Sequence, residues 1–144
     1  KLNAALVEKR VRLAFTEIPT ALGMSNHQGS KATEKLQLMK DLARVLKKMD
    51  KFFLDSFTNP ESRGYITMRR YGVPAQLRQV FLDHVESPHQ IKTNLDSLAA
   101  LSHEMDIAVG IAHVKPITLE VLKKEIPRLE SEGYRFIRLS QAVR

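Results

Sequence analysis

The sequence contains no cysteine and no tryptophan, and aromatic residues make up only 6% of its 144 residues. The lack of cysteine excludes disulfide bonds and metal sites built from thiolates. No apolar run approaches the length of about 20 residues that a transmembrane helix needs, so we expect no membrane span in this chain. The first residues, KLNAALVEKR, lack the apolar core of a signal peptide. If the protein is exported, we expect its signal upstream of Lys1.

Basic residues outnumber acidic ones, and the formal net charge is +7. Such a charge by itself favours a polyanionic partner. However, the basic residues are mixed with acidic ones in stretches such as KATEKLQLMKDLARVLKKMDK, which is typical of a solvent-exposed helix face. MRRYG is the only short basic run with a neighbouring aromatic residue, and the sequence contains no zinc-finger, RNP-type or basic-zipper pattern. We therefore expect no nucleic-acid partner.

Apolar residues recur every three or four positions in several segments, and this spacing predicts amphipathic helices. The helices expected from the pattern cover about residues 2–16, 31–49, 61–71, 87–105 and 118–133. Ser87-Pro88 and Thr118 are typical helix starts, whereas Gly72 and Gly133 are typical residues after a helix end.

Short apolar runs of strand length lie between these helices: TALGM, KFFL, QVFL, IAVGI and YRFIRL. The alternation predicts an α/β fold with a mostly parallel sheet of about five strands. No repeat, low-complexity tract or linker is present, so we expect one domain over residues 1–144. Five strands are few for a closed barrel, and the chain opens with a helix. Either the sheet is open, or the sequence begins partway through a larger domain.

Hydrogen-bonding or ionisable residues follow each expected strand. They are Ser25-Asn26-His27, Asp55-Ser56, Asp83-His84, His113 and Ser140-Gln141. The carboxyl ends of parallel strands share one rim, where ligands bind in α/β folds, so we expect these side chains to meet. A simpler role stays open for several of them, because His27 can cap the next helix and Asp is common at helix starts and turns.

His113 is the best single candidate for proton transfer, because it follows a strand that is apolar on both faces and precedes a proline turn. Arg78 either orients a rim carboxylate or is a surface charge. His84, His89 and His103 lie in helix-start or surface contexts, and the sequence gives them no role. The sequence contains no nucleophile elbow, phosphate-binding loop or dinucleotide fingerprint. Metal-assisted hydrolysis is the reaction class that the residues after the expected strands fit best, because His and Asp on one rim can hold a cation that activates water.

Five ordered segments carry a resemblance to a known family: GMSNHQGSKAT, FFLDSFTNPES, LRQVFLDH, IAVGIAHVKPITLEVL and RFIRLSQ. From about residue 18 to its end, the chain resembles the divergent polysaccharide deacetylases. This bacterial family is related to carbohydrate esterases that remove N-acetyl groups from chitin-like and peptidoglycan sugars. The resemblance implies a distorted (β/α) barrel with a substrate groove at the carboxyl rim, in a periplasmic or secreted protein.

The resemblance also implies roles for particular residues. His27 would be one ligand of a metal, typically zinc, and His113 would protonate the leaving amine, with Asp83 and Arg78 as further catalytic residues. The substrate-binding residues that it implies are Asn26, Ser30, Asp55 and Ser56. The expected partner is a polysaccharide or an N-acetylated sugar oligomer.

Two features depart from the deacetylases of the wider superfamily. No Asp-Asp strand motif precedes His27, and Lys31 stands where the better-known enzymes have a second histidine ligand. One hypothesis is therefore the carboxyl-terminal part of a metal-dependent deacetylase. Another is a non-catalytic module that binds glycan or a cell-envelope partner. A third is a truncated product whose exposed sheet edges favour association into oligomers.

Overall fold

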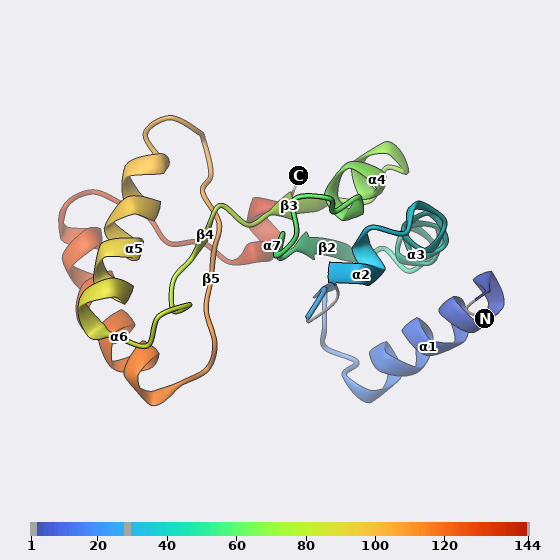
Figure 1. Cartoon of the computed structure of the whole chain (residues 1–144), viewed down its shortest axis with the longest axis horizontal. Helices are drawn as coiled ribbons and strands as arrows, with labels where there is room; N and C mark the ends of the chain where they lie inside the picture. The colour runs from blue at the N-terminus through green and yellow to red at the C-terminus, as the bar shows by residue number, and fades with distance from the viewer. Residues whose placement is uncertain (1–2, 28–29, 144) are drawn as a thin grey trace. The chain divides into compact units, whose positions relative to one another are not determined.

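The computed structural model describes residues 3–27 and 30–143. The chain divides into two compact units, residues 1–77 with 139–144, and residues 78–138 (Figure 1). Two such units can be parts of one larger domain, so the expectation of a single domain stays a prediction. No helix in the described ranges combines the length and the apolar character needed to cross a lipid bilayer.

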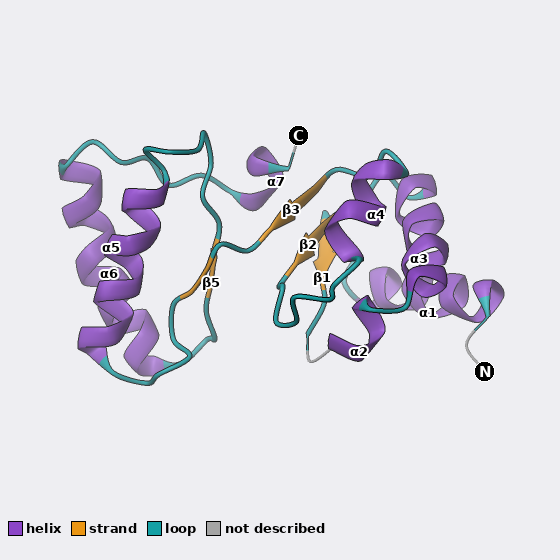
Figure 2. Cartoon of the chain, turned by 45° about the horizontal axis from the view of Figure 1, so that its top comes forward, coloured by secondary structure: helices purple, strands orange, loops and turns teal. Residues whose placement is uncertain are grey.

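The first unit is a small parallel sheet covered by helices. Its elements are α1 (Ala4–Glu17), β1 (Gly23–Ser25), α2 (Ser30–Thr33), α3 (Leu36–Lys48), β2 (Phe52–Asp55), α4 (Gly64–Arg70), β3 (Ala75–Leu77) and α7 (Leu139–Ala142). The sheet order is β1-β2-β3, and both pairs are parallel. A helix lies between consecutive strands, as the crossover between parallel strands requires (Figure 2). Within the described residues β1 and β3 are edge strands, and association through these edges stays a prediction.

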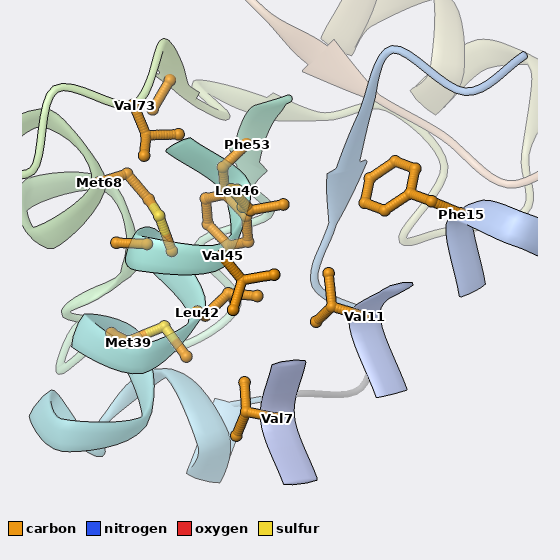
Figure 3. Packing of buried hydrophobic residues seen from close by; sticks show 12 residues of the cluster. Val7, Val11, Phe15, Met39, Leu42, Val45, Leu46, Phe53, Met68 and Val73 are labelled. Carbon is orange, nitrogen blue, oxygen red and sulfur yellow. The ribbon is translucent and has the colours of Figure 1, made fainter. Parts of the chain in front are cut away.

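The core of this unit lies between the sheet and the helices α1, α3 and α4 (Figure 3). Val7 and Val11 lie one helical turn apart on α1 and belong to the buried cluster with residues of α3. Leu46 of α3, Phe53 of β2 and Met68 of α4 are at most 1% exposed. Because these residues come from three different elements, their burial holds the helices on the sheet and thereby fixes the strand ends.

The second unit pairs two short strands with two long helices. Its elements are β4 (Val80–Phe81), α5 (Pro88–Leu101), β5 (Gly110–Ile111) and α6 (Pro116–Ser131). The two strands are parallel, and α5 and α6 lie side by side in both views (Figures 1 and 2). Leu82, Leu95 and Leu129 form the core. A Cβ atom on Gly110 would lie 2.7 Å from Leu98 Cδ2, so glycine lets β5 approach α5 closely.

The expected helices are present, but α4 begins at Gly64 and α5 ends at Leu101, inside the expected ranges 61–71 and 87–105, and two further corrections apply. The helix expected over residues 31–49 is two helices, α2 and α3, with a break at Glu34 and Lys35. The last long helix begins at Pro116 and not at Thr118. Proline suits the first turn of a helix, where its missing N–H has no partner to lose, and the Thr118 hydroxyl has another partner, described below. Gly72 and Gly133 have φ of +69° and +98° just after α4 and α6, as helix-ending glycines often do.

The expected strands are partly correct. QVFL and IAVGI contain β4 and β5, and TALGM and KFFL overlap β1 and β2, which each end one residue later. YRFIRL contains no strand, and its last residue begins α7. Apolar content alone does not make a strand, because a strand also needs a neighbouring edge with which to pair. The third strand of the first sheet, β3, follows Pro74 and was not expected.

The described residues therefore have a mixed α/β fold with parallel sheets. They form two sheets of three and two strands, where the sequence predicted a single parallel sheet of about five strands as part of a distorted barrel. A five-stranded barrel is not seen among these residues.

Candidate functional site

The carboxyl ends of β4 and β5 bring Asp83 and His113 together. The two strands are parallel neighbours, so the residues that follow them lie at the same edge. The backbone N–H of His113 donates to Asp83 Oδ2 at 2.9 Å, and the imidazole Nδ1 lies 3.0 Å from Asp83 Oδ1. The contact expected from two strand ends that are 30 residues apart in the sequence is therefore present.

The Asp83 carboxylate is 1% exposed, yet it is ionised. Burial alone would raise the pKa of Asp83, but hydrogen bonds from Thr118 and His113 lower that pKa below its ordinary value. The Thr118 hydroxyl donates to Asp83 Oδ2 at 2.8 Å. An ionised carboxylate only accepts hydrogen bonds, so Nδ1 of His113 carries a proton and donates it. In the neutral imidazole, Nε2 is then the nitrogen with a free lone pair.

The ring of Phe81 lies beside His113, and Arg78 lies beside Phe81. The rings of Phe81 and His113 lie 5.2 Å apart between centroids and are tilted by 43°. Arg78 Cζ lies 5.7 Å from the centroid of the Phe81 ring, in the range of a cation–π contact. The His113 side chain is 42% exposed, so a ligand can reach an imidazole whose orientation is fixed by a buried carboxylate.

In the first unit, Asn26 connects the ends of β1 and β2. Its Oδ1 accepts the backbone N–H of Ser56 at 2.9 Å, and Ser56 is buried. These two predicted substrate-binding residues are therefore in contact, as neighbouring parallel strand ends should be. Whether they bind substrate stays a prediction.

Asp55 is fully buried and holds the start of α4. Its Oδ2 accepts the Ser62 hydroxyl at 2.7 Å and the backbone N–H of Tyr65 at 2.9 Å. Its Oδ1 accepts the backbone N–H of Phe57 at 3.0 Å, and Phe57 has φ of +45°. Aspartate at the amino end of a helix satisfies N–H groups that have no helical partner. Asp55 therefore shapes the loop after β2, and a role in substrate binding stays a prediction.

His27 lies in a bend after β1 and is exposed. Together with Asn26 it lines a cavity of about 320 Å³, whose other walls are mainly apolar side chains of α1, β1 and α3. Ser30 begins α2, but its side chain lies outside the described part of the structure, as do Gln28 and Gly29.

The described residues do not by themselves fit the zinc site that the resemblance implies. Within residues 3–27 and 30–143, no group of three or more His, Cys, Asp or Glu side chains is placed to hold a metal ion. A catalytic zinc usually has three protein ligands, and His27 alone is not such a set.

Thr118, Phe81 and Asn94 are parts of the second unit to which the sequence patterns gave no role in the site. Thr118 was expected to open a helix, but Pro116 at the first turn places Thr118 two residues further into α6. The proline start of α6 shortly after β5 indicates that the first turn of α6 lies near the strand ends, but not which side chain faces Asp83. Asn94 lies inside α5 and gave no signal, because its contacts are with backbone carbonyls of another segment.

Comparison with known proteins gives a family. The sequence matches the family described as divergent polysaccharide deacetylase over residues 1–143. The uncharacterized protein YibQ of Escherichia coli is 29% identical over 129 residues, which are 90% of this chain and 40% of that protein. An uncharacterized protein of Haemophilus influenzae is 31% identical over 131 residues, 91% of this chain and 47% of that protein. The chain thus spans less than half the length of these relatives.

A solved structure shares the fold. An uncharacterized protein of Agrobacterium tumefaciens matches with a TM-score of 0.82 at 20% sequence identity. The match covers 85% of this chain and 50% of that one. At this identity the likeness concerns the fold alone.

Proposed function

Because the chain belongs to the divergent polysaccharide deacetylase family, we propose that it carries the proton-transferring part of a site that hydrolyses N-acetyl groups on a polysaccharide. The observation that carries this proposal is the His113 imidazole held by a buried, ionised Asp83 at the carboxyl ends of two parallel strands. A histidine in this setting is typical of general acid–base catalysis.

The proposed reaction needs a proton at the leaving nitrogen. Water attacks the carbonyl carbon of the acetamide, its protons pass to solvent, the C–N bond breaks, and the products are acetate and a free amine. An amine leaves with difficulty unless its nitrogen is protonated. His113 in its imidazolium form supplies that proton from Nε2, and the carboxylate of Asp83 stabilises the positive charge through Nδ1–H. Such a general acid typically contributes about 10²- to 10⁴-fold to the rate.

The remaining predicted site residues complete the proposal. Arg78 adds a positive charge beside Phe81 and supports catalysis. The residues proposed to bind the sugar chain are Asn26, Ser30, Asp55 and Ser56. The fold that we propose for the full-length protein is a distorted (β/α) barrel. The parallel pairing of every described strand and the helices between strands support this arrangement.

Zinc remains part of the proposal for the full-length protein, with His27 as one ligand. The described residues do not complete the ligand set, so metal content has to be measured on the full-length protein and on its His27→Ala variant. Loss of stoichiometric zinc in that variant would support His27 as a ligand, and unchanged zinc would remove it from the set. The proposed location is the periplasm or the outside of the cell, where envelope polysaccharide is found.

A second candidate function is a non-catalytic module that binds glycan or a cell-envelope partner. The observation that favours it is Lys31, an exposed residue of α2, at the position of a histidine ligand in the better-known deacetylases. Such a module would keep the fold and bind acetylated sugar without releasing acetate.

Acetate release from N-acetylglucosamine oligomers by the full-length protein distinguishes the deacetylase from the non-catalytic binding module. The deacetylase proposal predicts turnover that falls by about 100-fold or more in His113→Ala. The control is His89→Ala, which removes an exposed imidazole from α5 and should leave turnover unchanged. Oligomer binding without acetate release would support the module, and equal turnover of His113→Ala and wild type would contradict the role of His113.

A further inference from the structure

A second histidine, His84, lies beside the same aromatic ring as His113. His84 follows Asp83 directly in the loop after β4. Its ring centroid lies 6.5 Å from that of Phe81, and the His113 centroid lies 5.2 Å from it. Two imidazoles therefore flank one phenyl group at the carboxyl end of β4, within the reach of a single short oligosaccharide.

The proton on the His84 ring can be assigned from its neighbours. Nδ1 of His84 lies 3.2 Å from the Phe81 carbonyl oxygen. The amide nitrogen of Asn94 lies 2.9 Å from the Leu82 carbonyl oxygen, 3.3 Å from that of Phe81 and 3.5 Å from His84 Nδ1. An amide group has two hydrogens, and the two carbonyls use both. Since a carbonyl only accepts, Nδ1 of His84 carries a proton and donates it to Phe81.

Nε2 of the neutral His84 ring is therefore a hydrogen-bond acceptor, as it is in neutral His113. In the part of the chain that the structure describes, neither Nε2 atom has a hydrogen-bond partner. His84 is exposed. The Nδ1–H of His84 donates to a neutral carbonyl, whereas that of His113 donates to the Asp83 carboxylate, which stabilises a positive charge on the His113 ring. The geometry of His84 thus suits accepting a hydrogen bond and not transferring a proton.

The loops that carry the two histidines are joined to each other. Asp83 binds His113 through two hydrogen bonds, and Glu86 forms an ion pair with Lys115. On these two loops Val85 and Val114 are 48% and 89% exposed, which provides apolar contact for the C–H face of a sugar ring. Polar groups held in place cost little entropy when a ligand binds, so such a surface is preorganised.

From this arrangement we infer that His84 is a substrate-binding residue. Its Nε2 accepts a hydrogen bond from a hydroxyl or amide N–H of an N-acetylated sugar oligomer. The sugar that it binds is next to the one whose leaving nitrogen His113 protonates. This inference rests on the proposed function, because it takes the sugar oligomer as the ligand. It gives a role to a histidine for which the sequence alone suggested none.

Steady-state kinetics of the full-length protein on N-acetylglucosamine oligomers test the inference. We expect His84→Ala to raise KM by about fivefold, the effect of one lost neutral hydrogen bond, with kcat within about twofold of wild type. His84→Gln places an oxygen acceptor near the position of Nε2 and should restore KM. The matched control, His89→Ala, should change neither constant.

The outcomes separate this inference from the proposed function. If His113→Ala lowers kcat while His84→Ala leaves KM within about twofold of wild type, the inference is overturned and the proposed function stands. If His113→Ala has no effect, the proposed function fails, and imidazole ¹⁵N spectra then decide the role of His84. We expect a protonated Nδ1 in the free protein and a shift of the His84 Nε2 signal on adding the oligomer. An Nε2 signal that does not move overturns the inference.

Discussion

His113 donates two hydrogen bonds to Asp83, one from its backbone N–H at 2.9 Å and one from its imidazole Nδ1 at 3.0 Å. The backbone bond fixes where the loop after β5 lies, and the side-chain bond fixes how the ring is turned. Because Thr118 holds the same carboxylate from α6, three segments of the second unit determine the direction of one imidazole. The predictions below test this arrangement and the fold that supports it.

Asp83→Asn should lower kcat for acetate release by about 100-fold or more. The amide oxygen can take the place of Oδ2, which accepts both the backbone N–H of His113 and the Thr118 hydroxyl. The NH₂ group of the amide then faces Nδ1, which favours the tautomer protonated at Nε2 and removes the negative charge beside the ring. Imidazole ¹⁵N shifts report the tautomer. Asp96→Asn, which changes an ion-paired carboxylate on α5, is the control and should leave kcat unchanged.

Thr118→Val should destabilise the protein and weaken its response to acid. The pKa of Asp83 is lower in the folded than in the unfolded chain. The ionised carboxylate therefore contributes its full stabilisation of the fold at pH values above the ordinary pKa of aspartate, about 3.9. That effect is lost as the pH falls through the folded value.

Without the Thr118 hydroxyl, the folded pKa of Asp83 moves back towards the ordinary one. We expect the free energy of unfolding at neutral pH to fall by about 1–2 kcal/mol and to change less on acidification than in wild type. Urea unfolding at neutral pH and at about pH 3 measures both effects. Thr93→Val removes an exposed hydroxyl that bonds to the His89 carbonyl and is the matched control. If the free energy of unfolding of Thr118→Val depended on pH as in wild type, the Thr118 hydroxyl would not be a cause of the lowered Asp83 pKa.

Gly64→Ala should destabilise the first unit by about 1–3 kcal/mol, as overpacking of a filled site does. A Cβ atom at this position would lie 2.5 Å from Asp55 Oδ2 and 3.1 Å from Phe53 Cε1. The carboxylate cannot move away without losing its bonds to Ser62 and Tyr65. Chemical denaturation measures the change, and a variant as stable as wild type would show that Asp55 does not hold the start of α4 as described.

Leu46→Ala should cost about 2–5 kcal/mol of stability, because it opens a cavity in a core site that has no exposure. Leu119→Ala is the comparison. Leu119 is 42% exposed on α6, and its truncation should cost less than about 0.5 kcal/mol. Similar losses for the two variants, measured by urea unfolding, would be inconsistent with the core shown in Figure 3.

Much of the fold could be predicted from the sequence, because helix spacing is a strong signal. The segments of α1, α4, α5 and α6 were expected, with ends that differ by a few residues. Short strands were harder, since their formation depends on a partner elsewhere in the chain. YRFIRL has strand-like composition but no strand, whereas the short β3 pairs with β2 after a proline.

The candidate site was predictable where it depends on the strand ends. Because β4 and β5 are parallel neighbours, Asp83 lies next to His113, and because β1 and β2 are parallel neighbours, Asn26 lies next to Ser56. Contacts that depend on helix rotation were not predictable. Thr118 reaches Asp83 from within α6, and Asn94 binds two carbonyls beside His84 from within α5. Thr118 lies in the segment IAVGIAHVKPITLEVL, but the segment does not show which way its side chain faces. Only the packing of each helix on its strand brings Thr118 and Asn94 to these positions.

If His113 protonates the leaving amine, the effect of removing it should depend on the leaving group. The full-length wild type and His113→Ala are compared on an N-acetylglucosamine oligomer and on 4-nitrophenyl acetate, whose leaving group needs no proton. We predict that the variant loses about 100-fold or more in kcat on the oligomer but little on the activated ester. An equal loss on both substrates, or no loss on the oligomer, would contradict the account.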